Sequence, residues 1–283
     1  MASAVVGVVG AGQMGTGIAH VFATSGFEVR MFDQRTSALE QSKDAIERRL
    51  AKECDKGRIS VEGKQSAIGR VRLANSIANL SEAECIVEAV SENESVKIKV
   101  LQELSAVCGK DTILASNTSS ISITRLGSFV ARPDRVVGVH FMNPVPVMEL
   151  VEIIEGVNTS EDVSRTAKEL VEKIGKTPVV IGDSPGFGVN RILIPMINEA
   201  CFAVYEGVGS VEDMDRLMTL GAKHPVGPLA LADLIGIDTC VSIMDVLYEG
   251  YGDPKYRVCP LLRRMVDAGR LGRKSGVGFY SYE

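Results

Sequence analysis

Short apolar runs rich in β-branched residues alternate with segments of helical periodicity through the first 183 residues of the chain. The apolar runs predict strands at residues 5–9, 28–32, 85–88, 112–115, 136–140, 149–154 and 178–181. Apolar positions recur at helical spacing in segments 14–25, 37–56, 94–107 and 160–174, which predicts helices. This alternation is typical of an α/β domain built on a doubly wound, mainly parallel Rossmann-type sheet.

Two departures from the alternation predict the domain plan. Residues 36–70 form a helical excursion, with one helix, a turn near Gly57 and a second helix. Only helical patterns follow residue 183, so we expect a sheet domain of residues 1–183 and an all-helical domain of residues 184–283. Asp183 or Ser184 is predicted to cap a helix that starts at Pro185, and Pro195 is predicted to kink it. The stretch "SVED" at 210–213 resembles a capping box.

Composition then excludes several classes of partner. The chain has 283 residues, 45% of them apolar, and a formal charge of −5 without runs of like charge, which predicts a globular protein with no nucleic-acid partner. Six dispersed cysteines without a C-x-x-C pair, and three histidines, predict reduced thiols and no metal site. The N-terminus lacks the basic residues of a targeting peptide, and the longest apolar stretch, 192–204, is too short to span a bilayer. We therefore expect a cytoplasmic protein with no membrane partner.

A glycine-rich turn follows the first predicted strand. In "GAGQMG", Gly10, Gly12 and Gly15 form the pattern G-x-G-x-x-G, which suits a tight turn, close approach of a pyrophosphate and close packing of helix on strand. Asp33 ends the second predicted strand, where a carboxylate accepts hydrogen bonds from a ribose 2′-hydroxyl and repels a 2′-phosphate. The predicted cofactor is therefore NAD, although nearby Arg35 leaves NADP open. The predicted binding loop consists of Gly10, Ala11, Gly12, Gln13, Met14 and Gly15.

Polar residues gather where the later strands end. The stretch "ILASNTSS" at 113–120 changes abruptly from apolar residues to hydroxyls and an amide. His140 ends the next predicted strand, and Asn143 lies just beyond it. Ligands of doubly wound sheets bind beyond the carboxyl ends of the strands. Glu152 alternates onto the same face as Leu150 and Ile154, where a carboxylate needs a partner, and we predict that it pairs with His140. Such a pair can exchange a proton with a carbinol during hydride transfer.

These stretches together resemble the L-3-hydroxyacyl-CoA dehydrogenases, above all the short bacterial enzymes that act on 3-hydroxybutyryl-CoA. The likeness covers essentially the whole chain. It is carried by "GAGQMGTGIA", "VEAVSEN", "LASNTSSISIT", "HFMNPVPVMELVEII", "PGFGVNRILIPMINEA", "HPVGPLALADLIGID" and "GRKSGVGFY". The resemblance implies NAD-dependent, reversible oxidation of a short-chain L-3-hydroxyacyl-CoA in the cytoplasm.

The resemblance also implies roles for individual residues. His140 is the implied general base or acid, Glu152 orients it, and Ser119 and Asn190 hold the oxygens of the substrate. Implied NAD contacts beyond the glycine loop come from Asp33, Glu92, Lys97, Asn117, Ser119, Asn143 and Lys274. The helical excursion would hold the phosphates of CoA through Lys52 and Lys56, which lie four residues apart on a predicted helix. Relatives form homodimers through the helical domain, which suits the apolar segment 187–205.

Two other functions fit parts of this pattern. One is a dehydrogenase of a free hydroxy acid or sugar acid, as in crystallin-like relatives, which needs no CoA-binding lysines. The other is a nucleotide-binding structural or sensor protein without catalysis, against which the presence of Ser119, His140, Glu152 and Asn190 together argues. The preferred acyl-chain length, the physiological direction and any assembly beyond a dimer have no signature in the sequence.

Overall fold

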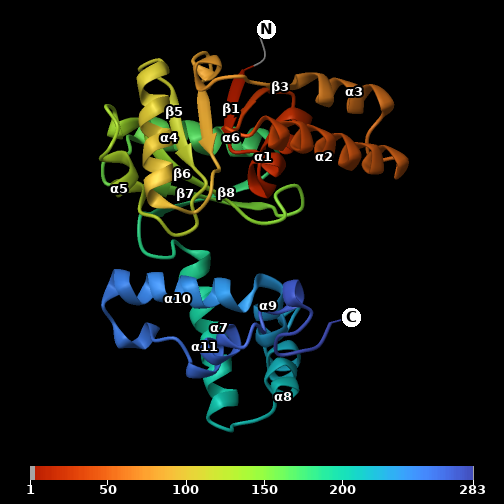
Figure 1. Cartoon of the computed structure of the whole chain (residues 1–283), viewed down its shortest axis with the longest axis vertical. Helices are drawn as coiled ribbons and strands as arrows, with labels where there is room; N and C mark the ends of the chain where they lie inside the picture. The colour runs from red at the N-terminus through yellow and green to blue at the C-terminus, as the bar shows by residue number, and fades with distance from the viewer. Residues whose placement is uncertain (1–3, 283) are drawn as a thin grey trace. The chain divides into compact units, whose positions relative to one another are not determined.

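The computed structural model describes residues 4–282 of the chain, which form two compact units that divide after Asp183 (Figure 1). The first unit contains a sheet of eight strands in the order β3-β2-β1-β4-β5-β6-β7-β8. The strands are β1 (Val5–Val9), β2 (Glu28–Phe32), β3 (Val71–Leu73), β4 (Cys85–Glu88), β5 (Ile113–Ser116), β6 (Val136–Phe141), β7 (Leu150–Glu155) and β8 (Thr177–Gly182). The predicted doubly wound, mainly parallel sheet is thus confirmed.

The order of the strands creates a switch point between β1 and β4. The chain moves outward from β1 through β2 to β3, and then returns to build β4, β5 and β6 on the other side. Every neighbouring pair is parallel except β6 and β7, which are antiparallel. Ligands of such sheets bind beyond the carboxyl ends at the switch point. The glycine loop after β1 lies at this position.

Helices cover both faces of the sheet. Residues of α1 (Gln13–Thr24) and α6 (Glu161–Lys173) share one apolar core with alternate strand residues such as Val8, Val87 and Val139. The opposite face carries α4 (Glu94–Val107) and the short α5 (Ile123–Gly127). A Cβ placed on Gly138 of β6 would lie 2.9 Å from Ile123, which shows that α5 packs against the face to which Gly138 belongs.

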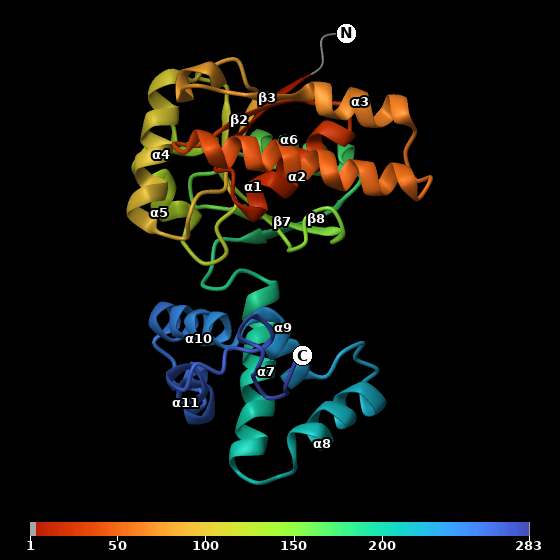
Figure 2. The same cartoon turned by 45° about the vertical axis from the view of Figure 1, so that its right-hand side comes forward.

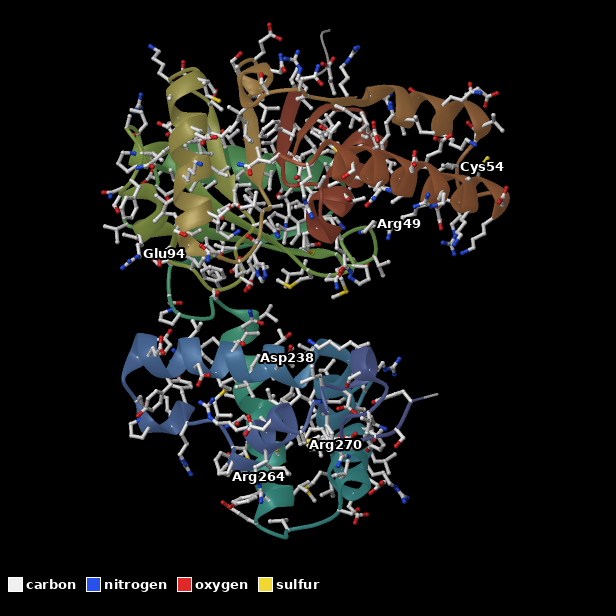
Figure 3. All side chains as sticks on the ribbon, in the orientation of Figure 1. Arg49, Cys54, Glu94, Asp238, Arg264 and Arg270 are labelled. Carbon is white, nitrogen blue, oxygen red and sulfur yellow. The ribbon has the colours of Figure 1, made fainter. Side chains whose placement is uncertain are left out.

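The predicted helical excursion is a hairpin of α2 (Thr36–Asp55) and α3 (Val61–Arg70), which lie side by side in Figures 1 and 2. Gly57 in the connecting turn has a φ of +69°, and the Ser60 side chain caps α3. One side of α2 is buried through Leu39, Ile46 and Leu50. Both helices of the hairpin pack on α1. Polar side chains extend from the rest of the hairpin, as the neighbourhood of Arg49 and Cys54 in Figure 3 shows.

The second unit is built around α7, as Figure 2 shows. Its helices are α7 (Val189–Tyr205), α8 (Val211–Arg216), α9 (Pro228–Ile235), α10 (Ile237–Tyr251) and α11 (Pro260–Asp267). The capping box at Ser210 and Asp213 is confirmed, and α7 continues through Pro195. The predicted start at Pro185 is wrong: Gly186 and Phe187 have φ values of +74° and +53°, which a right-handed helix excludes, so α7 begins at Val189.

Two buried carboxylates hold the C-terminal segment in the second unit. Asp233, with only 1% of its surface exposed, accepts hydrogen bonds from the backbone of Phe279 and Tyr280 and from the hydroxyl of Tyr282. The Tyr280 hydroxyl donates to Asp215, whose carboxylate also accepts from two amides at the N-terminus of α9. Short bridges link Gly272 to Val277 and Val277 to Ser281, so this otherwise helical unit ends in a small antiparallel turn. Within residues 4–282, no helix is long and apolar enough to cross a membrane.

Candidate active site

The glycine loop has the geometry of a phosphate cradle. Gly10 has a φ of +104°, and a Cβ there would lie 2.5 Å from the carbonyl oxygen of Ala89. A Cβ on Gly15 would lie 1.8 Å from the Gly10 carbonyl oxygen, so α1 approaches the turn too closely for any side chain. A Cβ on Gly12 would meet nothing within 4 Å. The loop is therefore closed on its protein side and open above Gly12, at the N-terminus of α1, which fits the phosphates of a dinucleotide.

A pocket of about 630 Å³ lies over this loop. Of the predicted cofactor residues, Gly10, Gly12, Gln13, Met14 and Asp33 line it, together with Ala89, Val90 and Ser91 after β4. Asp33 Oδ2 accepts a hydrogen bond of 2.8 Å from the backbone of Ala11, and Arg35 keeps a 75% exposed side chain with its Nε 3.6 Å from Asp33 Oδ1. The carboxylate is thus fixed at the rim of the pocket, where a ribose hydroxyl would bind.

Amides join the ends of the neighbouring strands. Asn117 follows β5 directly, and its Oδ1 accepts a 2.9 Å hydrogen bond from the backbone of Phe141 in β6. Asn143 Oδ1 accepts one of 2.9 Å from Gln13 Nε2 in the glycine loop. The predicted cofactor residues of three separate segments therefore lie along one edge of the sheet.

His140 and Glu152 form a buried pair across β6 and β7. The antiparallel register places the two residues directly opposite each other, and Nδ1 of His140 lies 2.7 Å from Oε2 of Glu152. The two residues are only 7% and 2% exposed. A carboxylate acceptor places the proton of the neutral ring on Nδ1, so Nε2 is the nitrogen with the basic lone pair. The predicted juxtaposition is present in the structure.

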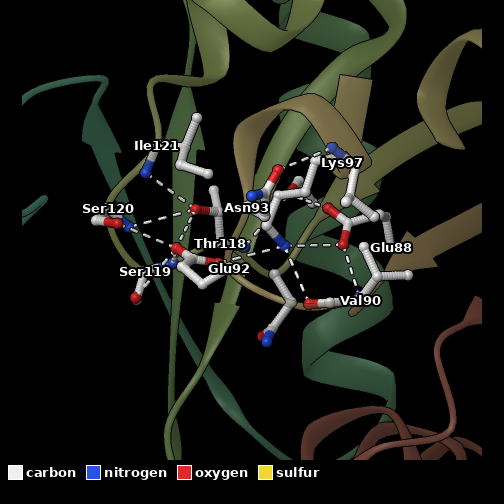
Figure 4. Close-up of polar contacts among 12 residues, drawn as sticks. Glu88, Val90, Glu92, Asn93, Lys97, Thr118, Ser119, Ser120 and Ile121 are labelled. Carbon is white, nitrogen blue, oxygen red and sulfur yellow. Dashed lines mark hydrogen bonds and ion pairs between the residues drawn. The ribbon is translucent and has the colours of Figure 1, made fainter. Parts of the chain in front are cut away.

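Glu92 accepts hydrogen bonds from the hydroxyl residues that follow β5. Its Oε1 accepts hydrogen bonds of 2.5 Å from Thr118 Oγ1, 2.9 Å from the Ser119 backbone, 3.2 Å from Ser119 Oγ and 3.1 Å from Ser120 Oγ (Figure 4). Burial alone would raise the pKa of Glu92, but the Lys97 ammonium and these hydrogen bonds outweigh burial and hold that pKa below its usual value. Glu92 is thus an ionised anchor for the segment that contains Ser119.

Lys97 is buried beneath Glu92 and forms an ion pair with Glu88, a residue that the sequence analysis missed. Its side chain is 1% exposed, and Nζ lies 2.8 Å from Glu88 Oε1 and 3.3 Å from Glu92 Oε2. Glu88 is fully buried at the end of β4 and also accepts a 2.6 Å hydrogen bond from Ser116. Glu88 could have been found as Glu152 was, since it too is a carboxylate in an apolar strand.

The remaining predicted site residues are distributed over both units. Lys52 is exposed in the last turn of α2, and Lys56 follows as the C-cap of that helix. In the helical unit, Asn190 belongs to the first turn of α7, and Lys274 forms an ion pair with Asp238. Their roles toward substrate and cofactor stay predictions.

Comparison with known proteins identifies the class to which this fold and site belong. The family model for the NAD binding domain of 3-hydroxyacyl-CoA dehydrogenase matches residues 5–184, and the model for the C-terminal domain of the same enzymes matches residues 186–282. The chain therefore belongs to the 3-hydroxyacyl-CoA dehydrogenase family, an NAD-binding family of oxidoreductases.

Individual relatives are similar over nearly their whole length. A probable 3-hydroxybutyryl-CoA dehydrogenase of Bacillus subtilis is 51% identical, with 98% of this chain and 96% of the relative covered. A 3-hydroxybutyryl-CoA dehydrogenase of Bradyrhizobium diazoefficiens is 52% identical, with 98% and 94% covered. The crystal structure of (S)-3-hydroxybutyryl-CoA dehydrogenase from Ralstonia eutropha superposes with a TM-score of 0.98 at 45% identity, with both chains covered completely.

The position of Asp33 predicts how cofactor preference depends on one carboxylate. Replacing Asp33 by Gly removes both the acceptor for the ribose hydroxyl and the repulsion of a 2′-phosphate. We expect the ratio of kcat/KM for NADP to that for NAD to rise by about tenfold or more, which corresponds to ~1.4 kcal/mol. Steady-state kinetics with both cofactors measure this ratio. Asp267→Gly, at the exposed end of α11 in the helical unit, is the matched control. An unchanged ratio in Asp33→Gly contradicts the assignment.

Proposed function

We propose that this protein catalyses the NAD-dependent, reversible oxidation of L-3-hydroxybutyryl-CoA to acetoacetyl-CoA. Support comes from relatives about 50% identical that bear the name 3-hydroxybutyryl-CoA dehydrogenase and from a family model that describes an NAD binding domain. The observation that carries the chemistry is the buried contact between His140 and Glu152 at the carboxyl end of β6. A dehydrogenase needs a proton acceptor at this edge, because the hydroxyl oxygen loses a proton as its carbon loses a hydride.

In this proposal the imidazole of His140 moves the proton. During oxidation, Nε2 accepts the proton of the 3-hydroxyl group; during reduction, Nε2 returns it to the 3-oxygen. Glu152 holds the ring through Nδ1 and balances the positive charge that the ring carries after it accepts the proton. When bound, the nicotinamide would supply the hydride acceptor at the carbinol carbon for oxidation and the hydride donor for reduction. The glycine loop and Asp33 hold the dinucleotide in place, and Asn117 and Asn143 order the edge of the sheet beside it.

Ser119 and Asn190 would act on the substrate rather than on the proton. Hydroxyl and amide donors suit the 3-oxygen and the thioester carbonyl, and fixing these oxygens orients the reacting carbon. Lys52 and Lys56 would bind the phosphates of CoA as point charges on the helical hairpin. The two ammonium groups are exposed on the hairpin, as a site for a soluble, multiply charged cofactor requires.

We also propose a homodimer that forms through the helical unit. This unit exposes several large apolar side chains, among them Ile192 at 74%, Leu217 at 61% and Leu220 at 68%. Large exposed apolar side chains are common where subunits meet. Light scattering should give twice the mass of the chain, and Leu217→Glu/Leu220→Glu should shift the protein toward monomer. A monomeric wild-type protein at micromolar concentration would contradict the proposal.

Replacing His140 tests the proton-transfer step directly. His140→Gln keeps a polar side chain but has no basic nitrogen, so kcat for acetoacetyl-CoA reduction by NADH should fall by about 10²–10⁴-fold. The dissociation constant for NADH, measured by fluorescence titration, should change little. His224→Gln, in the helical unit, is the control for loss of a histidine. Turnover near that of the wild type would rule out His140 as the acid.

Charge reversal on the hairpin distinguishes a thioester substrate from a free hydroxy acid. Lys52→Glu/Lys56→Glu should raise KM for acetoacetyl-CoA by about tenfold or more at low ionic strength, because charge-assisted contacts with phosphate are lost. Added salt should reduce the difference from the wild type. Lys168→Glu/Lys173→Glu on α6 changes the net charge equally and serves as the control. Activity on free 3-hydroxybutyrate equal to that on the thioester would favour the alternative substrate class.

A further inference from the structure

A buried chain of charged groups lies on the same face of the sheet as the His140–Glu152 pair, and the mechanism above does not use it. Its members are Glu88 of β4, Lys97 of α4 and Glu92 of the connecting segment (Figure 4). Glu88 and Lys97 are 0% and 1% exposed, whereas the Glu92 side chain is 39% exposed. The ammonium thus lies between a carboxylate that water does not reach and one at the surface.

Every polar atom of Glu88 is bound within the protein. Oε1 accepts from Lys97 Nζ at 2.8 Å and from the Val90 backbone at 2.7 Å, and Oε2 accepts from Ser116 Oγ at 2.6 Å. Lys97 Nζ is also 3.4 Å from the Val90 carbonyl oxygen. The Lys97 ammonium has thus lost its contact with water, and its contacts with the two carboxylates replace that hydration. Glu88 therefore fixes where the charge of Lys97 lies.

The register of the sheet connects this chain to the proposed catalytic pair. Glu88 lies opposite Ser116, and Ser116 opposite Gly138, so these residues form one row across β4, β5 and β6. His140 is two residues beyond Gly138 on the same face, and Thr118 is two residues beyond Ser116. Asn117, the first residue after β5, accepts a hydrogen bond from the Phe141 backbone, so the hydroxyl segment held by Glu92 begins beside β6, the strand that carries His140.

Few charged groups surround Glu92 besides Lys97. Glu88 contributes a second negative charge from β4, beyond the ammonium. The segment after β5 contributes only hydroxyls and amides. Arg125 of α5 forms an ion pair with Glu94. Lys97 is accordingly the cation that stabilises the ionised form of Glu92, and it must serve two carboxylates at once.

We propose that Glu88 and Lys97 are positioning residues: the anchored ammonium of Lys97 keeps Glu92 ionised, and ionised Glu92 holds Ser119 in the orientation that the reaction requires. This inference rests on the proposed function of Ser119 toward the substrate. It goes beyond the cofactor contact that the resemblance implies for Lys97, because it makes the effect of Lys97 on kcat depend on the charge of Glu88.

Removing the ammonium is the first test. In Lys97→Met, Glu92 loses its cation and faces Glu88 alone, so its pKa rises, and a falling pH protonates it and releases Ser119. We expect kcat for acetoacetyl-CoA reduction to fall by about 10–100-fold at pH 7. The ratio of variant to wild-type kcat should fall further from pH 8.5 to pH 6, and this ratio cancels titration common to both proteins. The dissociation constant for NADH is measured in the same variant and kcat is taken at saturating NADH, so that any loss of the implied cofactor contact is separated from the loss of kcat.

Restoring the charge balance is the second test. Lys97→Met/Glu88→Gln removes one charge of each sign, so the net charge of the group equals that of the wild type. We expect this variant to recover most of the kcat that Lys97→Met loses at pH 7, because the repulsion on Glu92 is gone. Lys99→Met, on the same helix but 71% exposed, is the matched control and should behave as the wild type.

Each outcome decides the proposal. A loss of kcat in Lys97→Met at saturating NADH that Glu88→Gln does not rescue would overturn the role of Glu88, whatever the change in affinity for NADH. A ratio of kcat that does not change with pH would overturn the role of Glu92 ionisation. If Lys97→Met does not fold, the double variant is compared with Glu88→Gln alone and must show the additional loss at low pH. A wild-type protein inactive on acetoacetyl-CoA would refute the proposed function, which these comparisons do not test.

Discussion

The antiparallel pairing of β6 with β7 is the constraint on which the proposed chemistry depends. All other neighbouring strands in the sheet are parallel. The reversal brings the chain back past the end of β6, so that Glu152 lies opposite His140. A slip of one residue would turn Glu152 to the opposite face, into the apolar core shared with α1 and α6, and would leave a buried imidazole without its carboxylate. Register thus determines the proton-transfer site as much as the identity of the two residues does.

The two faces of the sheet differ in chemistry. The face toward α1 and α6 consists of apolar residues such as Val8, Val87 and Val139. The face toward α4 and α5 buries Glu88, Ser116, His140 and Glu152 near the carboxyl ends of the strands. Gly138 lies opposite Ser116 of β5 and two residues before His140 in β6, and a Cβ at Gly138 would lie 2.7 Å from Ile154. Ile154 and Ile123 therefore pack directly against the backbone of β6 in the middle of this face, and close packing of this kind limits movement there.

Much of the fold was predictable because periodicity and turn chemistry are local. Strands β1, β2 and β4 begin and end where the sequence analysis placed them, and the hairpin of α2 and α3 follows from its pattern and from Gly57. The three-residue β3 and the five-residue α5 are too short to show a period, so they were missed. The start of α7 was misplaced because the positive φ of Phe187 has no signature in the residue type.

Residues of the candidate site could be predicted where a charged side chain interrupts the apolar pattern of a strand. Glu152 stood out as a carboxylate on an apolar face, and the structure places it against His140. Glu88 broke the same rule in "CIVE", yet the glycine loop and the hydroxyl segment explained that edge without it. Lys97 was named only through the resemblance, as an NAD contact, and its burial follows only from the packing of α4 on β4 and β5. Tertiary contacts of this kind have no local sequence signal.

The two buried pairs on this face differ in what their cations can do. An imidazole exchanges its proton near neutral pH, so a carboxylate beside one supports a charge that appears and disappears during a reaction. An ammonium between two carboxylates, as at Lys97, instead presents its charge at a fixed position. One face of the sheet therefore combines a pair that suits proton transfer with a pair that suits fixed geometry. The second pair, Glu88 and Lys97, contacts Glu92, which in turn holds the hydroxyl segment whose position the proposed proton transfer depends on.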